Sequence, residues 1–467
     1  MEHTHQHQHN NQPQQNTNKF GHWLKTSITA RLAMVGILTL ILLIPLFFIQ
    51  NLIDERSRRQ EDVVQEINEK WGNEVLLYGS VLKIPYKTFS EKIIRNEDSK
   101  KTYTETLESI NYAYFFPSDL NISSQVNPEE KERGIFKTAV YDSQINLKGS
   151  FSTPDFSIAE INPKYIIWDK VKLIVSTSNL KGVTTAKLQL NKTDYDFAST
   201  YNGKSNKRYN QLVMHTLETK VLKGLSVNSF EKNIPFALDF KIKGSEQIRF
   251  IPIGKQTTAT MTSNWKDASF FGEFLPFNDD KFTDAGFDAK WNILDLNRPF
   301  SQQHFGALPK LDEFAFGVNF MIPVDEYTKS ERSVKYGFLV IGLTFLLFFL
   351  IQTLSKINIH PFQYLMIGLA LTMFYTLLVS ISEHSNFLKA YLIAGVSVIS
   401  LITIYSKSIL STWKFPLFIG LSLTALYTFI YVIIQLENYA LIVGSIGLFI
   451  ILAIVMYVSR KIDWNNN

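Results

Sequence analysis

The chain has 467 residues, of which 46% are hydrophobic and 19% are charged, and it contains no cysteine. Its net charge of +5 comes without a stripe of basic residues, which argues against nucleic-acid binding. The lack of cysteine excludes disulfides, thiolate metal sites and cysteine nucleophiles. Charged residues are rare between 336 and 458 but frequent between 54 and 335, which excludes a purely soluble enzyme, a disordered protein and a chain that lies wholly in a membrane.

Residues 1–18 form a polar, low-complexity tail rich in His, Gln and Asn. Its histidines could chelate a metal ion, and they are His3, His5, His7 and His9. A disordered cytoplasmic tail is the simpler interpretation, so we predict no metal site and no cofactor.

The first apolar stretch runs from Leu32 to Ile53 and is bounded by Arg31 and Asp54. At about 22 residues it is long enough to span a bilayer as a helix, which takes about 20. No small-residue cleavage site follows a short apolar core, so we expect an uncleaved signal anchor. Beyond Asp54, apolar residues at helical spacing predict that the helix continues to Trp71.

The region after Trp71 has the alternation and the β-branched and aromatic residues of strands. The clearest signal is a hairpin over Phe236–Ile253 that turns at Gly244 and Ser245. Further strands are expected at Leu107–Phe116, Phe136–Phe151, Val171–Ser176, Thr185–Leu190, Thr257–Trp265 and Phe314–Val324. We therefore predict a mainly antiparallel β domain, with a sandwich as its expected arrangement. Whether it is one domain or two halves that meet near residues 202–204 stays open.

Five more apolar runs follow at short intervals. They are Tyr336–Leu354, Pro361–Ile381, Ala390–Tyr405, Phe415–Gln435 and Tyr439–Val458. None of these runs contains a charged residue, so they predict membrane helices rather than the core of a soluble protein. Six spans place both termini on one side, and Lys and Arg gather beside the short loops of that side, which predicts cytoplasmic termini.

Motifs for catalysis are not evident in the predicted β domain. Its two histidines, His215 and His304, are far apart, and there is no zinc helix, nucleophile elbow or phosphate loop. Acidic residues gather between 279 and 288, but their spacing fits no EF-hand, and a solvated loop is the simpler interpretation. A carboxylate pair for glycoside cleavage stays open, because such pairs are distant in sequence.

Four polar residues flank the run Pro361–Ile381 and are the candidate polar site of the membrane part. They are His360 and Gln363 at its start, and Glu383 and His384 at its end. One interpretation is that these residues only mark the ends of the span at the membrane surface, because a charge there reaches water at little cost. The other is a site in which Glu383 and His384 exchange protons or bind an envelope ligand.

Several segments together resemble the CreD family of bacterial inner-membrane proteins. They are YGSVLKIPY at 78–86, TSNWKDASFFGEFLP at 262–276, AGFDAKW at 285–291, SVKYGFLVIGLTFLLFFL at 333–350, HPFQYLMIGLALTMFYTLLVSISEH at 360–384 and RKIDW at 460–464. The resemblance begins near residue 23 and is looser between about 90 and 230. It implies an inner-membrane location and a role in cell-envelope integrity or envelope-stress response, and it supplies no catalytic residues.

These observations together predict an α+β membrane protein with a large, mainly antiparallel β domain outside the membrane. The predicted parts are a cytoplasmic tail over 1–18, a juxtamembrane segment and first span over 19–53, a periplasmic β domain over 54–334, a five-helix bundle over 335–459 and a second tail over 460–467. Besides the bilayer, we expect an envelope protein or lipid as partner, bound without catalysis.

The aromatic segment between residues 265 and 291 is the candidate contact surface for that partner. Its members are Trp265, Phe270, Phe271, Phe274, Phe277, Phe282, Phe287 and Trp291. The alternative for these residues is a place in the hydrophobic core. The alternative function is transport or lipid handling by the five-helix bundle, and an enzyme acting on envelope polymers comes third.

Overall fold

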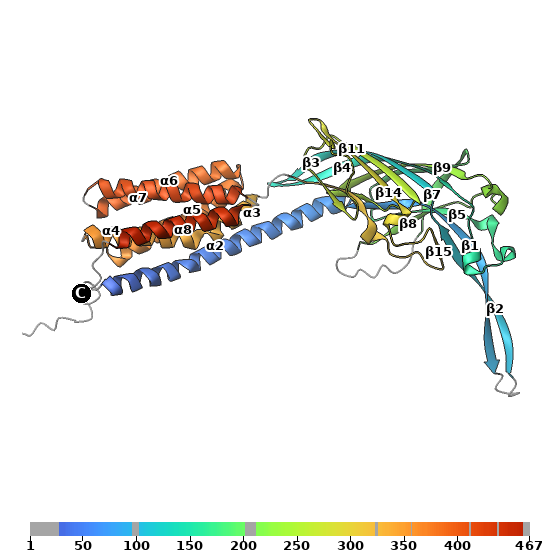
Figure 1. Cartoon of the computed structure of the whole chain (residues 1–467), viewed down its shortest axis with the longest axis horizontal. Helices are drawn as coiled ribbons and strands as arrows, with labels where there is room; N and C mark the ends of the chain where they lie inside the picture. The colour runs from blue at the N-terminus through green and yellow to red at the C-terminus, as the bar shows by residue number, and fades with distance from the viewer. Residues whose placement is uncertain are drawn as a thin grey trace, which may run out of the picture. The chain divides into compact units, whose positions relative to one another are not determined.

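The computed structural model describes residues 28–95, 102–200, 212–322, 326–355, 357–410, 412–436 and 439–460. The chain divides into a helical unit, Met1–Arg59 with Val324–Asn467, and a sheet unit, Gln60–Pro323 (Figure 1). The histidine-rich tail, the residues near 202–204 and Glu437 lie outside the described residues.

The helices follow the apolar runs of the sequence closely. They are α2 (Ile28–Trp71), α3 (Glu326–Lys335), α4 (Gly337–Ser355), α5 (Pro361–Ser382), α6 (Phe387–Ile409), α7 (Lys414–Gln435) and α8 (Ala440–Ser459). Within the described residues, six helical segments are long and apolar enough to cross a membrane, with α3 and α4 forming one of them. The continuation of the first helix to Trp71 is confirmed. The helix α3 was not predicted, and it belongs to the helical unit rather than to the β domain.

Close contacts hold α2 against the other helices of its unit. The side chain of Leu42 lies against Gly368 of α5, and Leu46 lies against Gly337 of α4, where any larger residue than glycine would collide with it. Inside the bundle, the Tyr364 hydroxyl donates a hydrogen bond to Gln352 Oε1 at 2.8 Å. Such glycine contacts and interhelical hydrogen bonds are typical of helix packing in membranes.

The strands make up most of the sheet unit. They are β1 (Val75–Arg95), β2 (Thr102–Phe115), β3 (Asp119–Arg133), β4 (Phe136–Phe151), β5 (Lys172–Thr177), β6 (Val183–Leu190), β7 (Thr193–Ser199), β8 (His215–Thr219), β9 (Ile234–Ser245), β10 (Gln247–Phe250), β11 (Gln256–Ser263), β12 (Ala268–Gly272), β13 (Phe282–Thr283), β14 (Gly286–Leu294), β15 (Gln303–Phe305) and β16 (Phe316–Phe320). All six strands that were predicted singly are present, with ends shifted by a few residues.

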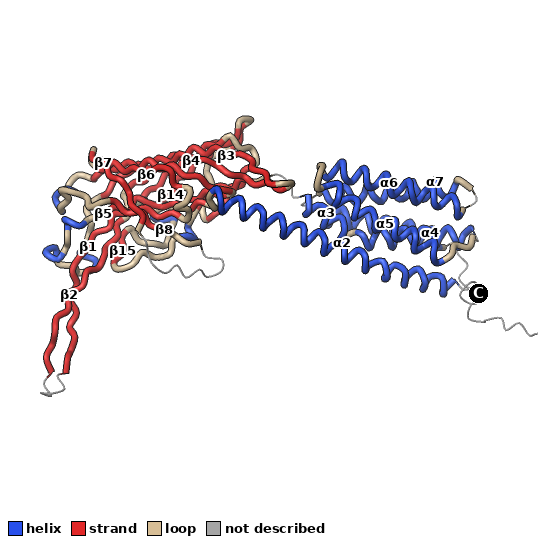
Figure 2. Tube along the Cα trace, turned by 180° about the vertical axis from the view of Figure 1, so that it is seen from behind, coloured by secondary structure: helices blue, strands red, loops and turns tan. Residues whose placement is uncertain are grey.

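Hydrogen bonds connect the sixteen strands of the described residues into one sheet. Its main path runs β12-β16-β10-β1-β5-β8-β7-β6-β9-β4-β3-β11-β14-β13, with β2 beside β1 and β15 beside β2. Pairing is antiparallel except between β1 and β10 and between β3 and β11. The outer parts of β1 and β2 form an arm that projects from the rest of the sheet unit (Figure 2).

The hairpin predicted over Phe236–Ile253 is wrong, although both of its strands exist. The first strand, β9, pairs with β4 and β6, whereas the second, β10, pairs with β1 and β16. Glu246 lies between them with a φ of 58°. There the chain passes from the half of the sheet that contains β4, β6 and β9 to the half that contains β1, β10 and β16, instead of folding back. Local alternation predicted each strand but carried no information on its partner.

One hydrophobic core lies between the two halves of the sheet. Aromatic rings from both halves meet in this core. The ring centres of Tyr141 of β4 and Phe320 of β16 are 5.3 Å apart, and those of Trp291 of β14 and Phe316 of β16 are 5.2 Å apart. The buried Tyr141 hydroxyl donates a hydrogen bond to the carbonyl oxygen of Gln247 at 2.5 Å. The halves therefore share a single core, and the outer faces of the strands are left to water.

Candidate functional site

Glu383 is held by two other helices at the end of α5. Its Oε1 atom lies 3.5 Å from Arg56 Nε of α2 and accepts a hydrogen bond from the Tyr327 hydroxyl of α3 at 3.3 Å. The Glu383 side chain is only 15% exposed. We call these three residues, Arg56, Tyr327 and Glu383, the polar clasp. His384 follows it and is exposed.

His360 and Gln363 cap the opposite end of α5. The backbone N–H of His360 donates to Gln363 Oε1 at 2.8 Å, and His360 Nδ1 accepts from the backbone N–H of Phe362 at 3.2 Å. This reciprocal pattern is a capping box, which satisfies N–H groups that have no partner inside the helix. A helix of 22 residues is about 33 Å long, so the four predicted polar residues do not form one site.

The polar clasp differs from the proton-exchanging pair that the sequence suggested. Glu383 is bound to Arg56 and Tyr327, which come from segments distant in the chain. These contacts connect α2, α3 and α5 through the Glu383 carboxylate, and the imidazole of the adjacent His384 is exposed to solvent. The arginines after the first span were the available signal, but nothing in the sequence paired Arg56 with Glu383.

Most of the predicted aromatic contact surface belongs to the core. Phe287 and Trp291 are 3% and 2% exposed, and the Phe270 ring lies 5.3 Å and 6.1 Å from them. The indole N–H groups are also used internally, because Trp265 donates to the Met321 carbonyl at 2.9 Å and Trp291 to the Phe274 carbonyl at 3.1 Å.

The remaining aromatic residues of that segment differ in exposure. Phe271 is partly exposed, with the Arg249 guanidinium 5.9 Å from its ring centre. The apolar side chains of the segment that do face solvent are Leu275, Phe277 and Phe282, which are 66%, 65% and 50% exposed. The predicted contact surface included the two phenylalanines but missed Leu275. The alternative assignment of this segment to the core therefore holds for Phe287 and Trp291, whereas Leu275, Phe277 and Phe282 face solvent.

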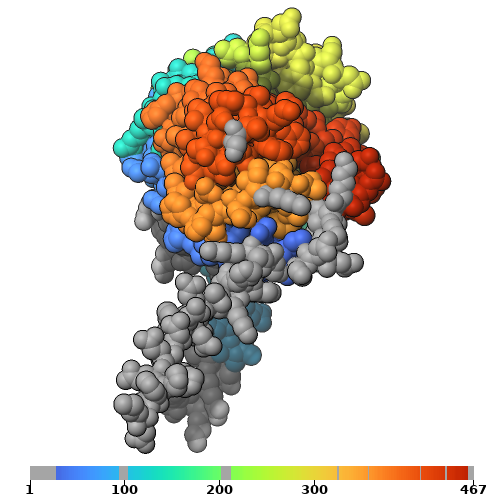
Figure 3. Space-filling model, turned by 90° about the vertical axis from the view of Figure 1, so that its left-hand side faces the viewer, coloured from blue at the N-terminus to red at the C-terminus, as the bar shows by residue number. Residues whose placement is uncertain are grey.

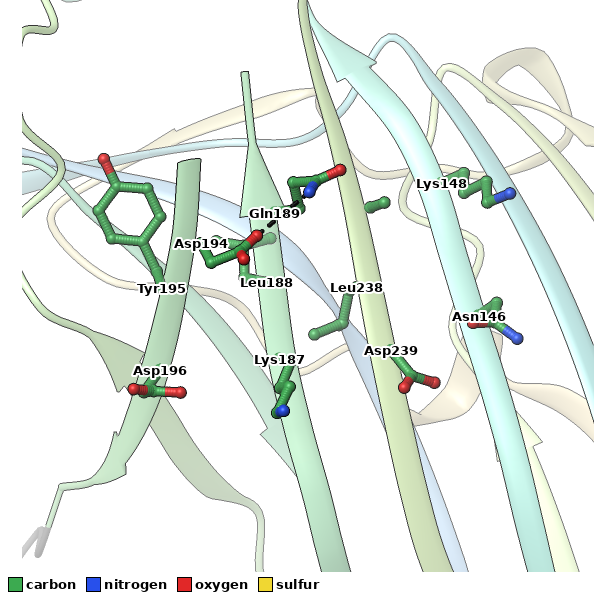
Figure 4. A pocket seen from close by; sticks show the side chains of 11 residues that line it. Asn146, Lys148, Lys187, Leu188, Gln189, Asp194, Tyr195, Asp196, Leu238 and Asp239 are labelled. Atoms are coloured by element: carbon green, nitrogen blue, oxygen red, sulfur yellow. Dashed lines mark hydrogen bonds between the residues drawn. The ribbon is translucent and has the colours of Figure 1, made fainter. Parts of the chain in front are cut away.

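A hollow on the outer face of the sheet gathers polar side chains from four adjacent strands (Figure 4). Register places one row across it, and its members are Asn146 of β4, Asp239 of β9, Lys187 of β6 and Asp196 of β7. A second row lies two residues along each strand, and its members are Lys148, Ala237, Gln189 and Asp194. We call these eight residues the polar hollow, whose volume is about 450 Å³.

The two rows explain both the shape and the polarity of the polar hollow. Side chains two apart on a strand share a face, so the members of both rows point the same way. Ala237 is small and sits between Lys148 and Gln189, which leaves space above the strand. The Gln189 side-chain N–H donates to Asp194 Oδ1 at 3.2 Å, whereas Asp239 Oδ1 is buried without a hydrogen-bond partner in the described structure.

The polar hollow offers three carboxylates, two primary amides and two ammonium groups to a ligand. This set can accept and donate hydrogen bonds at neighbouring points, as a hydroxyl-rich or zwitterionic ligand requires. Sequence reasoning missed the site, because its residues come from segments between 146 and 239 that only the register aligns.

The other polar residues considered in the sheet unit are dispersed. His215 is exposed at the start of β8, whereas His304 is packed 5.4 Å from the Phe116 ring, and burial lowers the pKa of its imidazole. Asp288 lies 3.6 Å from Lys290. Over the described ranges, no three His, Asp or Glu side chains are grouped so as to hold a metal ion.

Comparison with known proteins identifies the family. The family model described as Inner membrane protein CreD matches residues 27–465. The chain belongs to the CreD family. It is 28% identical over 431 residues to Inner membrane protein CreD of Escherichia coli (strain K12), and the match covers 91% of each chain. A CreD family member is an inner-membrane protein, and the six apolar helices agree with that location.

Proposed function

We propose that this protein supports cell-envelope integrity or the response to envelope stress as a binding protein without catalysis of its own. Its helices anchor it in the inner membrane, and its sheet unit binds an envelope component on the periplasmic side. The observation that carries the proposal is the polar hollow, where three aspartates, two lysines and two amides from four adjacent strands share one face of the sheet.

The composition of the polar hollow favours a hydroxyl-rich polymer of the envelope over an apolar partner. Two lysines, three aspartates and two amides line it, and they match the alternating donors and acceptors of a glycan. The site is a partly open hollow on the face of the sheet, which suits a segment of a long polymer better than an enclosed small molecule. Each hydrogen bond to such a polymer contributes little free energy, so the affinity would depend on the length of the polymer that is bound.

The proposed orientation rests on basic residues at the helix ends. Among described residues, Arg31, Lys407, Lys414 and Arg460 lie at or near the helix ends on the side of the termini, whereas the short outer connection between α5 and α6 is followed by Lys389. Short loops rich in Lys and Arg remain in the cytoplasm. The sheet unit would then be in the periplasm, where envelope polymers are available.

The test is a double variant of the polar hollow, Lys187→Ala with Asp239→Ala, in the full-length protein. We expect it to keep normal membrane abundance, to bind isolated cell-wall fragments at least fivefold less in a co-sedimentation assay, and to fail to restore envelope integrity in a deletion strain. The matched control is Glu129→Ala with Lys131→Ala, an exposed ion pair at the end of β3. Equal binding and full complementation by both double variants would exclude the polar hollow as the binding site.

A further inference from the structure

Helix α8 leaves an apolar groove along the helical unit. None of its residues is buried, and it lies at the edge of the bundle end shown in Figure 3, in dark red. The groove between α4, α7 and α8 has a volume of about 550 Å³. Its lining is apolar apart from the hydroxyl groups of Thr344 and Ser422.

Two glycines explain why the groove is open along only half of α8. Gly444 lies against Ile433 and Gly447 against Phe429, so that the first half of α8 contacts α7 directly. Beyond Gly447 the residues facing the groove are large, and they include Ile451, Val455 and Val458. Small residues allow two helices to approach and larger ones separate them, so the space widens toward the end of α8.

The dimensions of the groove match one leaflet of a bilayer. Its lining runs from Leu343 to Leu354 on α4, from Phe418 to Phe429 on α7 and from Gly447 to Val458 on α8. Each stretch rises about 17 Å along its helix, against a hydrocarbon half-thickness of about 15 Å. The groove therefore starts near the middle of the span and opens at the end where α4 and α8 finish and α7 begins.

Basic residues lie around that open end. Lys414, the first residue of α7, is exposed and lies one turn before the lining residue Phe418. Arg460 follows α8 directly, with its guanidinium 4.1 Å from the Tyr457 ring centre, and Trp413 precedes Lys414. Cations with Trp and Tyr at the end of an apolar span are placed at the level of lipid headgroups.

We propose that this groove is a binding site for an anionic phospholipid of the leaflet on the side of the termini. One acyl chain lies in the groove between α4, α7 and α8, and the phosphate group lies between Lys414 and Arg460. An apolar chain fills the space that the side chains of α8 leave open, and the two cations select a headgroup with net negative charge. The site is separate from the polar hollow and does not depend on the proposed function.

The first test compares lipids bound to the purified full-length protein by native mass spectrometry. After delipidation, equal amounts of phosphatidylglycerol and phosphatidylethanolamine are added, and we expect phosphatidylglycerol to be retained at least fivefold more. Lys414→Ala with Arg460→Ala should reduce this ratio to about one, whereas Lys389→Ala, at the other bundle end, should leave it unchanged. Equal retention of the two lipids by the unmodified protein would overturn the proposal.

The second test fills the groove without changing charge. Ser422→Phe with Val455→Phe should lower phosphatidylglycerol retention at least threefold, and Thr424→Phe, on the exposed face of α7, is the matched control. Thermal unfolding in detergent shows which variants are folded, and Val455→Phe alone replaces the pair if the pair does not fold. Retention by the groove variant equal to that of the control would place the lipid elsewhere and overturn the assignment.

Discussion

Trp291 and Phe277 come from one aromatic-rich segment but lie in opposite environments. Trp291 is 2% exposed on β14 and its indole N–H is hydrogen bonded, whereas Phe277 is 65% exposed in the preceding loop. The alternation of β14 places Phe287, Ala289, Trp291 and Ile293 on the core face. Residue type alone therefore did not separate a core residue from a contact residue.

Substitution by alanine should separate the two roles. Trp291→Ala should lower the free energy of unfolding by about 3–5 kcal/mol, because it removes a large buried side chain. Phe277→Ala should change it by less than about 0.5 kcal/mol. Chemical denaturation of the purified protein measures both, and similar losses for the two variants would contradict the assignment of Trp291 to the core and Phe277 to the surface.

Glu218 of β8 is an ionised group with two partners in the sheet unit. Its oxygens lie 2.6 Å from Lys83 Nζ of β1 and 2.9 Å from Lys172 Nζ of β5. Burial acts to raise the pKa of Glu218, but the hydrogen bonds from the two lysines outweigh it, so the pKa lies below the ordinary 4.5. A carboxylate with a lowered pKa in the folded state stabilises the fold above the pKa of the unfolded state.

The contribution of Glu218 to the free energy of unfolding should therefore disappear at acid pH. At neutral pH, Glu218→Gln should be less stable than the unmodified protein by about 2 kcal/mol, because both lysines lose a charged partner. This difference should shrink as the pH falls below about 4.5, when the unfolded carboxylate and then the folded one are protonated. Denaturation at a series of pH values checks it, and a difference that does not vary with pH would contradict the role of the charge.

The polar clasp connects α2, α3 and α5 through a single carboxylate. Arg56→Gln and Glu383→Gln should each lower the thermal stability of the protein in detergent, and the double variant should lose less than the sum. We expect a coupling of about 1 kcal/mol, near the upper limit for exposed pairs, because Glu383 is mostly buried. His384→Asn is the control and should leave stability and membrane abundance unchanged. Strictly additive losses would show that the two side chains do not interact.

Elements were predictable where their signal is local, and their partners were not. Charge-free runs predicted all six apolar segments, and alternation predicted strands such as β4 with the bounds that the structure has. Pairing depends on contacts between distant segments, so the expected hairpin of β9 and β10 was wrong, and the polar hollow could not be recognised from its scattered residues. The sequence analysis grouped His360 and Gln363 with Glu383 and His384, but the structure shows the first two as a capping box that the length of α5 separates from the other two.

Orientation in the membrane can be tested by single cysteines, because the natural chain has none. Asn191→Cys lies in an exposed turn of the sheet unit, and Thr412→Cys lies in the exposed connection before α7. We expect the first to react with an impermeant maleimide once the outer membrane is permeabilised, and the second only after lysis. The reverse labelling would overturn the topology inferred from the Lys and Arg residues.

The division of the helical unit into Met1–Arg59 and Val324–Asn467 has a consequence for biosynthesis. The ribosome completes α2 and must then translate the entire sheet unit before α4 and α5 emerge. At rates of about 5–20 residues per second, the first helix waits roughly ten seconds to a minute for them. During that interval Leu42 and Leu46 face lipid or the insertion machinery, and Arg56 has no Glu383 to bind. The first helix can therefore pack into the bundle only after the largest part of the chain has been synthesised.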